Sequence, residues 1–278
     1  MNGVAFSPDG KLLASANGDT TIGLWNPVTG QASGGFSGRN AVAFSPDGRL
    51  LAAAETDGTV RTWDLATRQP VGAPLPADPG GNVLGMAFRP DSTLLATADT
   101  DGRVRLWDLA TRRAVGAPLP GDPGGSVLGV AFSPDGKLLA SADGDGTVRL
   151  WNPGSGQAVG ASFPAVTSGG VNGVAFSPDG KLLAAAYSDG NARLWNLATR
   201  QAVGVPLPAG AGKGSVSGVA FSPDGKLLAT ADTDGTVRLW QMPLFANPYA
   251  ALCADVGPPT KAEWTHYAPG EPQPSVCQ

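Results

Sequence analysis

Few residues in the chain have the types and spacing that catalysis needs. Nucleophilic catalysis by serine or cysteine commonly requires a histidine beside the nucleophile, and the 278-residue sequence contains one histidine, His266. This histidine follows Trp264 and residues 260–263, Thr-Lys-Ala-Glu, which have the pattern of a capping box at the start of a short helix. We therefore interpret His266 as a surface or packing residue, and we predict no catalytic residue and no enzymatic activity.

The sequence also contains acidic and sulfur-containing groups that could be considered as metal ligands. Cys253, His266 and Cys277 are three potential zinc ligands, but their spacing differs from that of structural zinc sites. In a reducing cytosol we interpret both cysteines as free thiols, and a disulfide between Cys253 and Cys277 is the alternative. Residues 99–102, Asp-Thr-Asp-Gly, begin like a calcium loop, but Ala110 occupies the twelfth position, where an acidic ligand is needed. We therefore expect no metal and no cofactor.

Positive side chains recur just before the tryptophans of the chain. Five arginines stand two residues before a tryptophan: Arg61, Arg105, Arg149, Arg193 and Arg238. A ring of such cations could bind an anionic ligand. An arginine on a strand, however, more commonly covers apolar surface with its stem and pairs with nearby carboxylates. We favour this structural role.

The composition excludes several classes of protein. The 40 glycines and 25 prolines approach the content of disordered chains, but they recur at regular positions, and seven tryptophans and nine phenylalanines are enough to build a core. The net charge of −4 argues against a nucleic-acid partner, which needs a basic surface. We find no apolar run long enough for membrane insertion and no signal peptide. We expect a cytoplasmic globular protein.

One phrase, Val-Ala-Phe-Ser-Pro-Asp-Gly-Lys-Leu-Leu-Ala, recurs along the chain with few changes. A tryptophan follows each phenylalanine of this phrase after 19 residues. The phenylalanines are Phe6, Phe44, Phe88, Phe132, Phe176 and Phe221, and the tryptophans are Trp25, Trp63, Trp107, Trp151, Trp195 and Trp240. The spacing between successive phenylalanines is 38, then 44 three times, then 45 residues. The chain therefore consists mainly of six repeats.

Each repeat has the pattern of short β-strands separated by tight turns. In the third repeat we expect strands over 83–88, 94–98 and 104–107, and a weaker strand over 114–119. Pro118 and Pro120 place this fourth strand at an outer edge, where a missing N–H removes no ladder bond. Four short antiparallel strands in a repeat of this length are typical of a propeller blade, and blades must stack to bury both faces. The predicted fold class is all-β, a propeller with six four-stranded blades.

The repeats resemble the WD-repeat (WD40) family. Trp63-Asp64 and Trp107-Asp108 carry the dipeptide after which the family is named, and the other four repeats have Asn or Gln after the tryptophan. An aspartate stands six residues before each tryptophan: Asp19, Asp57, Asp101, Asp145, Asp189 and Asp234. The resemblance implies that this turn aspartate joins a hydrogen-bond network with the tryptophan, a strand hydroxyl and a histidine.

The sequence departs from this family network in two ways. The hydroxyl position is filled by Ser15, Thr97, Ser141 and Thr230, but by Ala53 and Ala185 in the second and fifth repeats. The histidine is absent from every repeat, and its place is taken by Pro79, Pro123, Thr167 and Gly212. A buried carboxylate without partners is costly. We therefore expect each turn aspartate to accept hydrogen bonds mainly from backbone N–H groups of its own turn.

We divide the chain into a propeller over 1–242 and a C-terminal tail over 243–278. The tail is a candidate to complete the last blade, and we expect two short helices in it, from about Pro248 and from Thr260. One hypothesis is a closed six-bladed ring; the other is part of a longer protein with an exposed edge that promotes self-association. The tail is similar to the ends of WD-repeat regions in large bacterial regulatory proteins.

The expected function is a non-enzymatic scaffold that binds protein or peptide partners on one face of the propeller. The resemblance places this face at the residues just before the turn aspartates: Gly18, Thr56, Thr100, Gly144, Ser188 and Thr233. These residues are small and neutral, a composition that favours modest affinity. Two alternatives remain: a sensor or regulatory part of a larger bacterial kinase or NTPase signalling protein, and a propeller that binds a small ligand.

Overall fold

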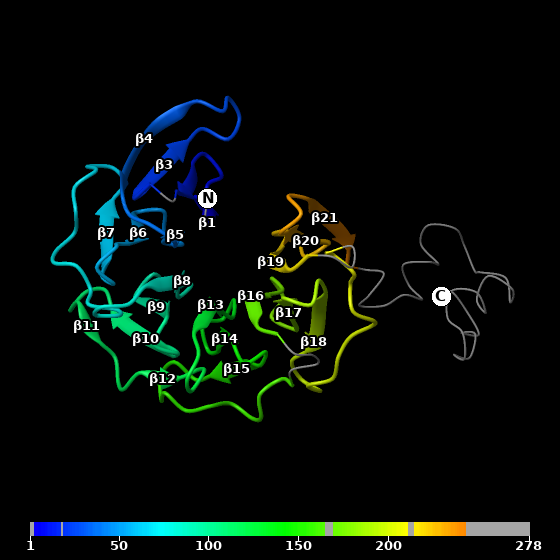
Figure 1. Ribbon diagram of the computed structural model, residues 1–278. Helices are drawn as coiled ribbons and strands as arrows, with labels where there is room; N and C mark the ends of the chain where they lie inside the picture. The colour runs from blue at the N-terminus through cyan, green and yellow to red at the C-terminus, as the bar shows by residue number, and fades with distance from the viewer. Residues whose placement is uncertain (1–2, 18, 165–168, 211–213, 243–278) are drawn as a thin grey trace, which may run out of the picture.

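The computed structural model describes residues 3–17, 19–164, 169–210 and 214–242. Within these ranges the chain forms β-strands and turns, and no helix there is long and apolar enough to cross a bilayer. The strands form six antiparallel sheets, one per repeat, which follow one another around an arc (Figure 1). We number these sheets blade 1 to blade 6 along the chain. The predicted tail, with its two helices, lies outside the described residues.

Each blade contains three core strands that pair in chain order. The first strands, innermost in Figure 1, are β1 (Gly3–Phe6), β5 (Val42–Phe44), β8 (Val83–Phe88), β13 (Val127–Phe132), β16 (Val171–Phe176) and β19 (Val216–Phe221). The second strands are β2 (Leu13–Ala16), β6 (Leu50–Ala54), β9 (Leu94–Asp99), β14 (Leu139–Asp143), β17 (Leu182–Tyr187) and β20 (Leu227–Asp232). The third strands are β3 (Thr21–Trp25), β7 (Val60–Asp64), β10 (Arg103–Asp108), β15 (Val148–Trp151), β18 (Ala192–Asn196) and β21 (Val237–Gln241).

The outer edges of the blades depart from the predicted four strands. Blade 1 has a continuous fourth strand, β4 (Ala32–Ser37), but blade 3 has two short pieces, β11 (Arg113–Ala114) and β12 (Leu119–Pro120), where one strand was predicted. The other blades have only isolated bridges at this edge or, in blade 6, no fourth strand among the described residues. In blade 3 the positive φ of 70° at Gly116 bends the chain between the two pieces. The blades therefore have three to four strands rather than a uniform four.

Close approach of the inner strands explains the small residues in them. Gly85, Gly129, Gly173 and Gly218 occupy equivalent positions in four successive first strands. A Cβ atom on Gly85 would lie 2.9 Å from the Cα of Gly129, and a Cβ on Gly129 or Gly173 would lie 3.5 Å from the Cα of the next glycine. Small residues therefore let the first strands of neighbouring blades lie close together.

Hydrophobic clusters fill the five junctions between successive blades. Between blades 3 and 4, Val104 and Leu106 of β10 pack with Val130 of β13 and Trp151 of β15. The other junctions repeat this arrangement with the equivalent residues. Each blade thus has an outgoing face, which packs on the next blade, and an incoming face, which packs on the previous one. Tryptophan and leucine side chains of the third strands are among the residues that fill these junctions.

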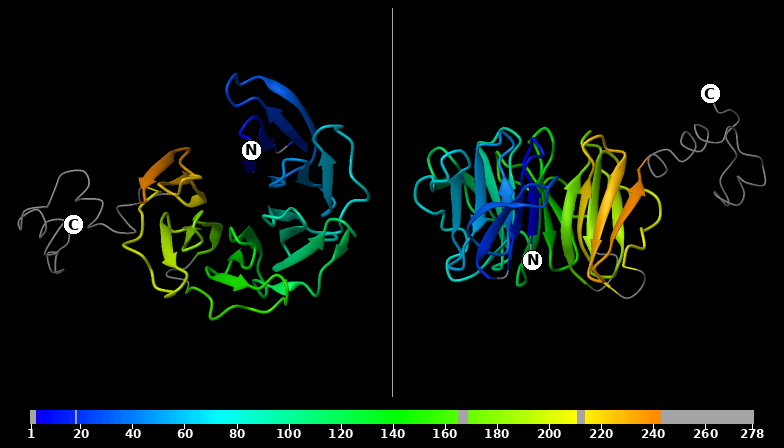
Figure 2. Two further views of the ribbon diagram at one scale, coloured as in Figure 1. Left: turned by 180° about the vertical axis from the view of Figure 1, so that it is seen from behind. Right: turned by 90° about the horizontal axis from the view of Figure 1, so that it is seen from above.

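Blades 1 and 6 do not meet to close a ring. No strand of blade 1 packs beside a strand of blade 6 in the described residues, and the two ends of the arc lie apart in both views (Figure 1, Figure 2). The incoming face of blade 1 and the outgoing face of blade 6 are consequently exposed. The structure therefore shows an open arc and not the closed six-bladed ring of the first hypothesis.

Candidate interaction face

The turns between the second and third strands lie at one end of the blades, together with the loops that lead into the next blade. In an antiparallel meander, successive connections alternate between the two ends of the strands, and the side view in Figure 2 shows the strands running through the thickness of the arc. We define the turn face by turns 19–20, 55–58, 99–102, 143–146, 187–190 and 232–235, with loops 77–82, 121–126, 169–170, 209–210 and 214–215.

Hydrogen bonds join neighbouring turns of this face into a band. The Asp78 amide donates to the Gly58 carbonyl of blade 2 (2.8 Å), while the Asp78 carboxylate accepts from the Thr100 hydroxyl of blade 3 (2.6 Å). The Ser126 hydroxyl donates to the Thr100 carbonyl (3.2 Å), and the Gly144 amide of blade 4 donates to the Ser126 carbonyl (2.9 Å). Loops 77–82 and 121–126 are thus each bonded to the turns on both of their sides.

A second set of hydrogen bonds joins the turns of blades 5 and 6. The Ser188 amide donates to the Gly170 carbonyl (3.0 Å), and the Ser215 hydroxyl donates to the Ser188 carbonyl (3.1 Å). The Thr233 amide of blade 6 then donates to the Ser215 carbonyl (2.9 Å). These bonds fix the positions of adjacent turns relative to one another.

Every turn aspartate accepts a hydrogen bond from a backbone N–H of its own turn. The donor lies two residues further along, as in Thr59 to Asp57 (3.0 Å) and Thr147 to Asp145 (2.9 Å). The same bond occurs at Asp19, Asp101, Asp189 and Asp234. The Thr59 hydroxyl also donates to Asp57 (2.7 Å) and thereby lowers the pKa of that carboxyl. The expected bonding of the turn aspartates to their own backbone is confirmed.

A second aspartate, two residues before the turn aspartate, organises a buried chain of hydrogen bonds in blades 3, 4 and 6. In blade 3 the Trp107 indole donates to the Thr97 hydroxyl (3.4 Å), and this hydroxyl donates to Asp99 (3.2 Å). Arg105 pairs with Asp99 and with Asp101, both at 2.6 Å. In blade 4 the equivalent residues are Trp151, Ser141, Asp143 and Arg149. In blade 6, Trp240 donates to Thr230 and Arg238 pairs with Asp232, but the hydroxyl that donates to Asp232 is that of Thr236.

Blades 2 and 5 lack the hydroxyl of this chain because Ala53 and Ala185 occupy its position. The indole nitrogens of Trp63 and Trp195 are buried, and they have no hydrogen-bond partner among the described residues. A buried donor without a partner costs about 1–3 kcal/mol. The repeats thus differ in how well they satisfy the same tryptophan.

The arginines that precede the tryptophans form ion pairs within their own blades. Besides the pairs in blades 3, 4 and 6, Arg193 pairs with Asp189 (2.6 Å) and Arg61 with Glu55 (3.2 Å). Local carboxylates therefore match these positive charges, as predicted. The described residues contain no ring of unpaired arginines at this position that would attract an anion.

The buried strand-end aspartates were missed by sequence reasoning. The resemblance assigned the network to turn aspartates such as Asp101, but it is Asp99 that accepts the hydroxyl and is buried, whereas Asp101 is exposed. The sequence does contain a pattern that distinguishes the blades with this buried aspartate. The repeats that have a hydroxyl followed two residues later by aspartate are those with Thr97, Ser141 and Thr230, while Glu55 and Tyr187 follow the two alanines.

Burial dominates the electrostatics of two strand-end aspartates. It raises the pKa of Asp99 to about 7 and that of Asp143 to about 6, although Arg105 and Arg149 favour the charged forms. The Oδ1 atoms of both carboxyls are buried and have no hydrogen-bond partner within the described ranges. Pro123 stands at the histidine position of the loop beside Asp143, so no imidazole can reach this oxygen. The missing histidine thus leaves a buried acceptor unfilled.

Two of the six predicted partner-binding residues hold the face together through their side chains. The Thr100 hydroxyl accepts the amide N–H of Asn82, and the Thr233 hydroxyl accepts that of Ser215, both at 2.9 Å. Substitution of either threonine would therefore disturb the loop that it holds. Thr100 and Thr233 are positioning residues of the turn face and poor places to probe partner contacts.

The other predicted face residues differ in their exposure. Thr56 is exposed, and its side chain forms no hydrogen bond in the described part of the chain. Gly144 is exposed and Ser188 is half-buried, while Gly18 lies outside the described residues. Exposed Pro79 and Pro123, at the tips of the loops, complete the accessible part of the face.

The remaining candidates for a disulfide or a metal site are residues of the C-terminal tail. Cys253, Cys277 and His266 lie outside the described residues, so the thiol and disulfide interpretations stay predictions. In the described ranges, no group of three or more histidine, cysteine, aspartate or glutamate side chains is arranged to hold a metal ion.

Comparison with protein families gives a match over most of the chain. The family model for the WD domain, G-beta repeat (WD40), matches residues 1–26, 33–64, 73–108, 116–152, 160–196 and 207–241. Each segment contains the three core strands of one blade, and the second and fourth also include an outer strand of the preceding blade, β4 and β12 respectively. No curated protein matches the chain.

Proposed function

Because the chain belongs to the WD40 repeat family, we propose that it is a non-enzymatic scaffold whose turn face binds partner proteins or peptides. WD40 repeats generally mediate protein–protein interactions. The observation that supports this role most is the set of hydrogen bonds that hold the turns of blades 2 to 4, and those of blades 5 and 6, in fixed positions. A fixed surface reduces the ordering that binding would otherwise require.

The residues of this face favour a partner bound by many small contacts. Thr56, Gly144, Pro79 and Pro123 are exposed there, and none has the large side chain of a typical hot spot. We therefore expect modest affinity for a single partner site, raised where a partner presents several such sites. A cytoplasmic signalling role belongs to the same proposal.

Paired substitutions on the two faces test the proposal. Thr56→Arg and Pro123→Arg place a large charged side chain on the exposed turn face, and Val28→Arg is the control. Val28 is 91 % exposed in the turn between β3 and β4, at the opposite end of the blades. The three chains are used as baits in native lysate, and each captured protein is then titrated against the purified chain.

We expect both turn-face variants to weaken binding of the captured protein at least about tenfold, which is a loss of 1.4 kcal/mol, and Val28→Arg to bind like the native chain. A captured protein that loses affinity only with Val28→Arg, or with none of the three variants, contradicts the placement on the turn face. Binding of a small molecule at the turn face, in place of any protein, would favour the ligand-binding alternative.

A further inference from the structure

Loop 121–126 holds a carboxylate of the turn face that no other group of the described chain binds. Asp122 is only 6 % exposed. Its backbone is fixed, because its amide donates to the Gly102 carbonyl (2.9 Å) and its carbonyl accepts from the Gly125 amide (3.3 Å). Its carboxylate forms no hydrogen bond and no ion pair within the described ranges. A buried charge without a partner is costly, so this carboxylate is a candidate to bind a group from another molecule.

The equivalent carboxylate one blade earlier shows which group fills such a position. In blade 3 the Thr100 hydroxyl donates to Asp78 Oδ2 (2.6 Å) and accepts the amide N–H of Asn82 (2.9 Å). Blade 6 uses half of this arrangement, since the Thr233 hydroxyl accepts the amide N–H of Ser215 (2.9 Å). A hydroxyl suits both bonds because it is a donor and an acceptor at once.

Blade 4 has the loop of this arrangement but lacks its hydroxyl. Residue 144, equivalent to Thr100, is glycine, and Ser126 stands in the place of Asn82. The Ser126 amide N–H consequently has no hydrogen-bond partner in the part of the chain that the structure describes. A Cβ atom on Gly144 would lie 2.9 Å from Asp122 Oδ2, 3.1 Å from the Ser126 carbonyl oxygen and 3.6 Å from the Ser126 nitrogen. The acceptor of Asp122 and the donor of Ser126 therefore lie beside the same position.

The backbone around this position matches that of blade 3. The Gly144 amide donates to the Ser126 carbonyl (2.9 Å), as the Thr100 amide does to the Asn82 carbonyl (3.0 Å). Gly144 is exposed and has no side chain to cover the loop. The partners of a hydroxyl are thus held in place, which lowers the ordering cost of binding, and a group from another molecule can reach them.

The hydrogen-bonding groups and charges here disfavour other classes of ligand. Arg149 pairs with Asp143 (2.6 Å) and Asp145 (2.7 Å) and forms no ion pair with Asp122. A lysine or arginine of a partner could pair with Asp122, but it has no acceptor for the Ser126 N–H. A carboxylate or phosphate could accept that N–H, but the charge of Asp122 would repel it. A neutral hydroxyl satisfies both groups.

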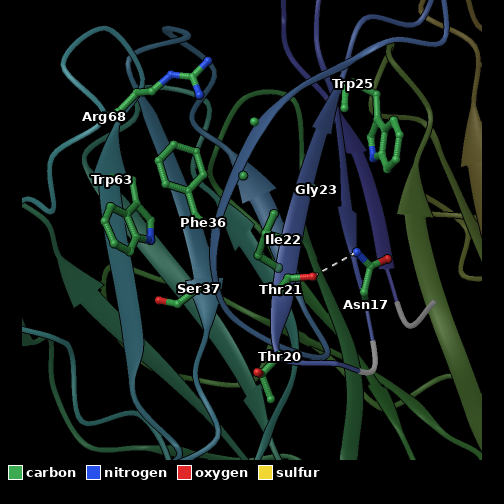
Figure 3. Close-up of a pocket in the computed structure, with 13 residues that line it drawn as sticks. Asn17, Thr20, Thr21, Ile22, Gly23, Trp25, Phe36, Ser37, Trp63 and Arg68 are labelled. Atoms are coloured by element: carbon green, nitrogen blue, oxygen red, sulfur yellow. Dashed lines mark hydrogen bonds between the residues drawn. The ribbon is translucent and has the colours of Figure 1, made fainter.

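The wider groove beside β3 lacks this combination of groups. Its volume is about 740 Å³, and no carboxylate occurs among the described residues that line it (Figure 3). The Asn17 amide and the Thr21 hydroxyl in its lining bond to each other (3.3 Å). This groove therefore cannot hold a hydroxyl in the way that Asp78 and Asn82 hold that of Thr100.

From these observations we propose that Asp122, Ser126 and Gly144 form a site on the turn face for the unmodified hydroxyl of a serine or threonine in a partner peptide. We call these three residues the hydroxyl site. The inference rests on the proposed function, because it names the group that the turn face recognises. The partner hydroxyl donates to Asp122 Oδ2 and accepts the Ser126 N–H. Phosphorylation of that hydroxyl removes the donor and adds negative charge beside Asp122, so it prevents binding.

Short peptides selected from a random-sequence library on the full 278-residue chain are the probe. Each selected peptide is titrated by fluorescence polarisation in three forms: as selected, with its serine or threonine replaced by alanine, and with that residue phosphorylated. Gly144→Thr is the test variant, because it places a hydroxyl of the chain itself in the site after a small shift of the Asp122 side chain. Ser188→Thr is the matched control, since it adds one methyl group at the equivalent position of blade 5. Circular dichroism checks the fold of both variants.

We expect the selected peptides to share one serine or threonine. Its replacement by alanine, or its phosphorylation, should weaken binding to the native chain at least about tenfold, as for the loss of a hydrogen bond to a charged group. Ser188→Thr should show the same difference. Gly144→Thr should bind the hydroxyl and alanine forms equally, because its own hydroxyl then occupies the site.

Binding that is unchanged by the alanine replacement, or that depends on a lysine or on the phosphorylated form, would overturn the hydroxyl site. A preference for the hydroxyl form that persists in Gly144→Thr would overturn it too. If Pro123→Arg weakens such binding, the peptides still bind the turn face, and only the hydroxyl site fails. If the native chain selects no peptide, or Pro123→Arg has no effect on the selected ones, the proposed function fails as well.

Discussion

Leu150 of blade 4 and Leu239 of blade 6 stand at the same place in their repeats, one residue before the tryptophan, yet Leu150 is 3 % exposed and Leu239 is 65 % exposed. The local sequences around them are nearly identical. The difference comes from the neighbour: the incoming face of blade 5 covers Leu150, and no blade covers Leu239. In this fold a repeat supplies only half of each buried contact, so the same residue is core inside the arc and surface at its end.

The largest expected effect on stability comes from replacing each of the two leucines with alanine. We expect Leu150→Ala to lower the free energy of unfolding by about 2–5 kcal/mol, because it leaves a cavity in a packed junction. Leu239→Ala should change it by less than about 0.5 kcal/mol, as for most surface substitutions. Urea unfolding, at a concentration where the chain is monomeric, measures both. Equal losses would mean that the blade 6 end is packed in solution.

A pH titration probes the buried carboxyls of the interior blades. The pKa of Asp99 is raised to about 7 and that of Asp143 to about 6 by burial, so the folded chain holds protons that the unfolded chain releases near pH 4. The resulting stabilisation is complete below pH 4 and is lost as pH rises through 6 to 7. We expect the free energy of unfolding to fall by a few kcal/mol between pH 5 and pH 8.

Asp99→Asn is the control for this titration. The asparagine cannot ionise, so the variant should show a smaller fall in stability between pH 5 and pH 8 than the native chain. Carboxyls with lowered pKa, such as Asp91 at about 2 beside Arg89, act in the opposite direction, but only when the pH falls below 4. An unfolding free energy that stays constant from pH 5 to pH 8 would show that Asp99 and Asp143 are ionised throughout this range.

Removing the equivalent threonine hydroxyl from blade 3 and from blade 6 compares an interior blade with the last blade of the arc. Thr97→Ala should lower the free energy of unfolding by about 1–2 kcal/mol, because it leaves the buried Trp107 indole N–H without a partner. Thr230→Ala should cost less, because Trp240 is partly exposed and water can replace the hydroxyl. Thermal unfolding of the two variants measures the difference. A larger cost for Thr230→Ala would contradict the idea that blade 6 ends in solvent.

The smallest expected effect is an increase in the free energy of unfolding. Ala185→Ser introduces a hydroxyl at the position that Ser141 and Thr97 fill in other blades, where it can accept the orphaned Trp195 indole N–H. We expect it to raise the free energy of unfolding by about 0.5–1.5 kcal/mol. Ala53→Ser beside Trp63 is the parallel case. If both serines destabilise the chain, the alanine blades are packed too tightly for the network.

Much of the fold could be predicted from sequence because the same pattern of strands and turns occurs in all six repeats. The phenylalanine and tryptophan positions predicted the strands and the faces that pack, and the turn aspartates bond as expected. The fourth strand was less predictable, since Gly116 and the prolines break it into pieces whose pairing depends on the neighbouring third strand.

The site was harder to predict for a physical reason. Asp99 and Asp101 are equally polar in sequence, and only their burial assigns one to the Thr97 hydroxyl and the other to the turn. Thr100 likewise looks like a free surface residue until loop 77–82 is placed against it. Whether the arc closes was open at the sequence level, because each repeat shows both halves of a junction but not which blades meet.

Cysteine reactivity at two equivalent valines tests most directly whether the arc ends in exposed faces. Val237→Cys and Val148→Cys are compared, each in a chain with Cys253→Ser and Cys277→Ser, and Val28→Cys gives the rate of an exposed thiol. At a concentration where the chain is monomeric, we expect the thiol at position 237 to react as fast as that at 28, and the thiol at 148 to be protected. Equal protection at 237 and 148 would contradict an exposed face at the blade 6 end of the arc.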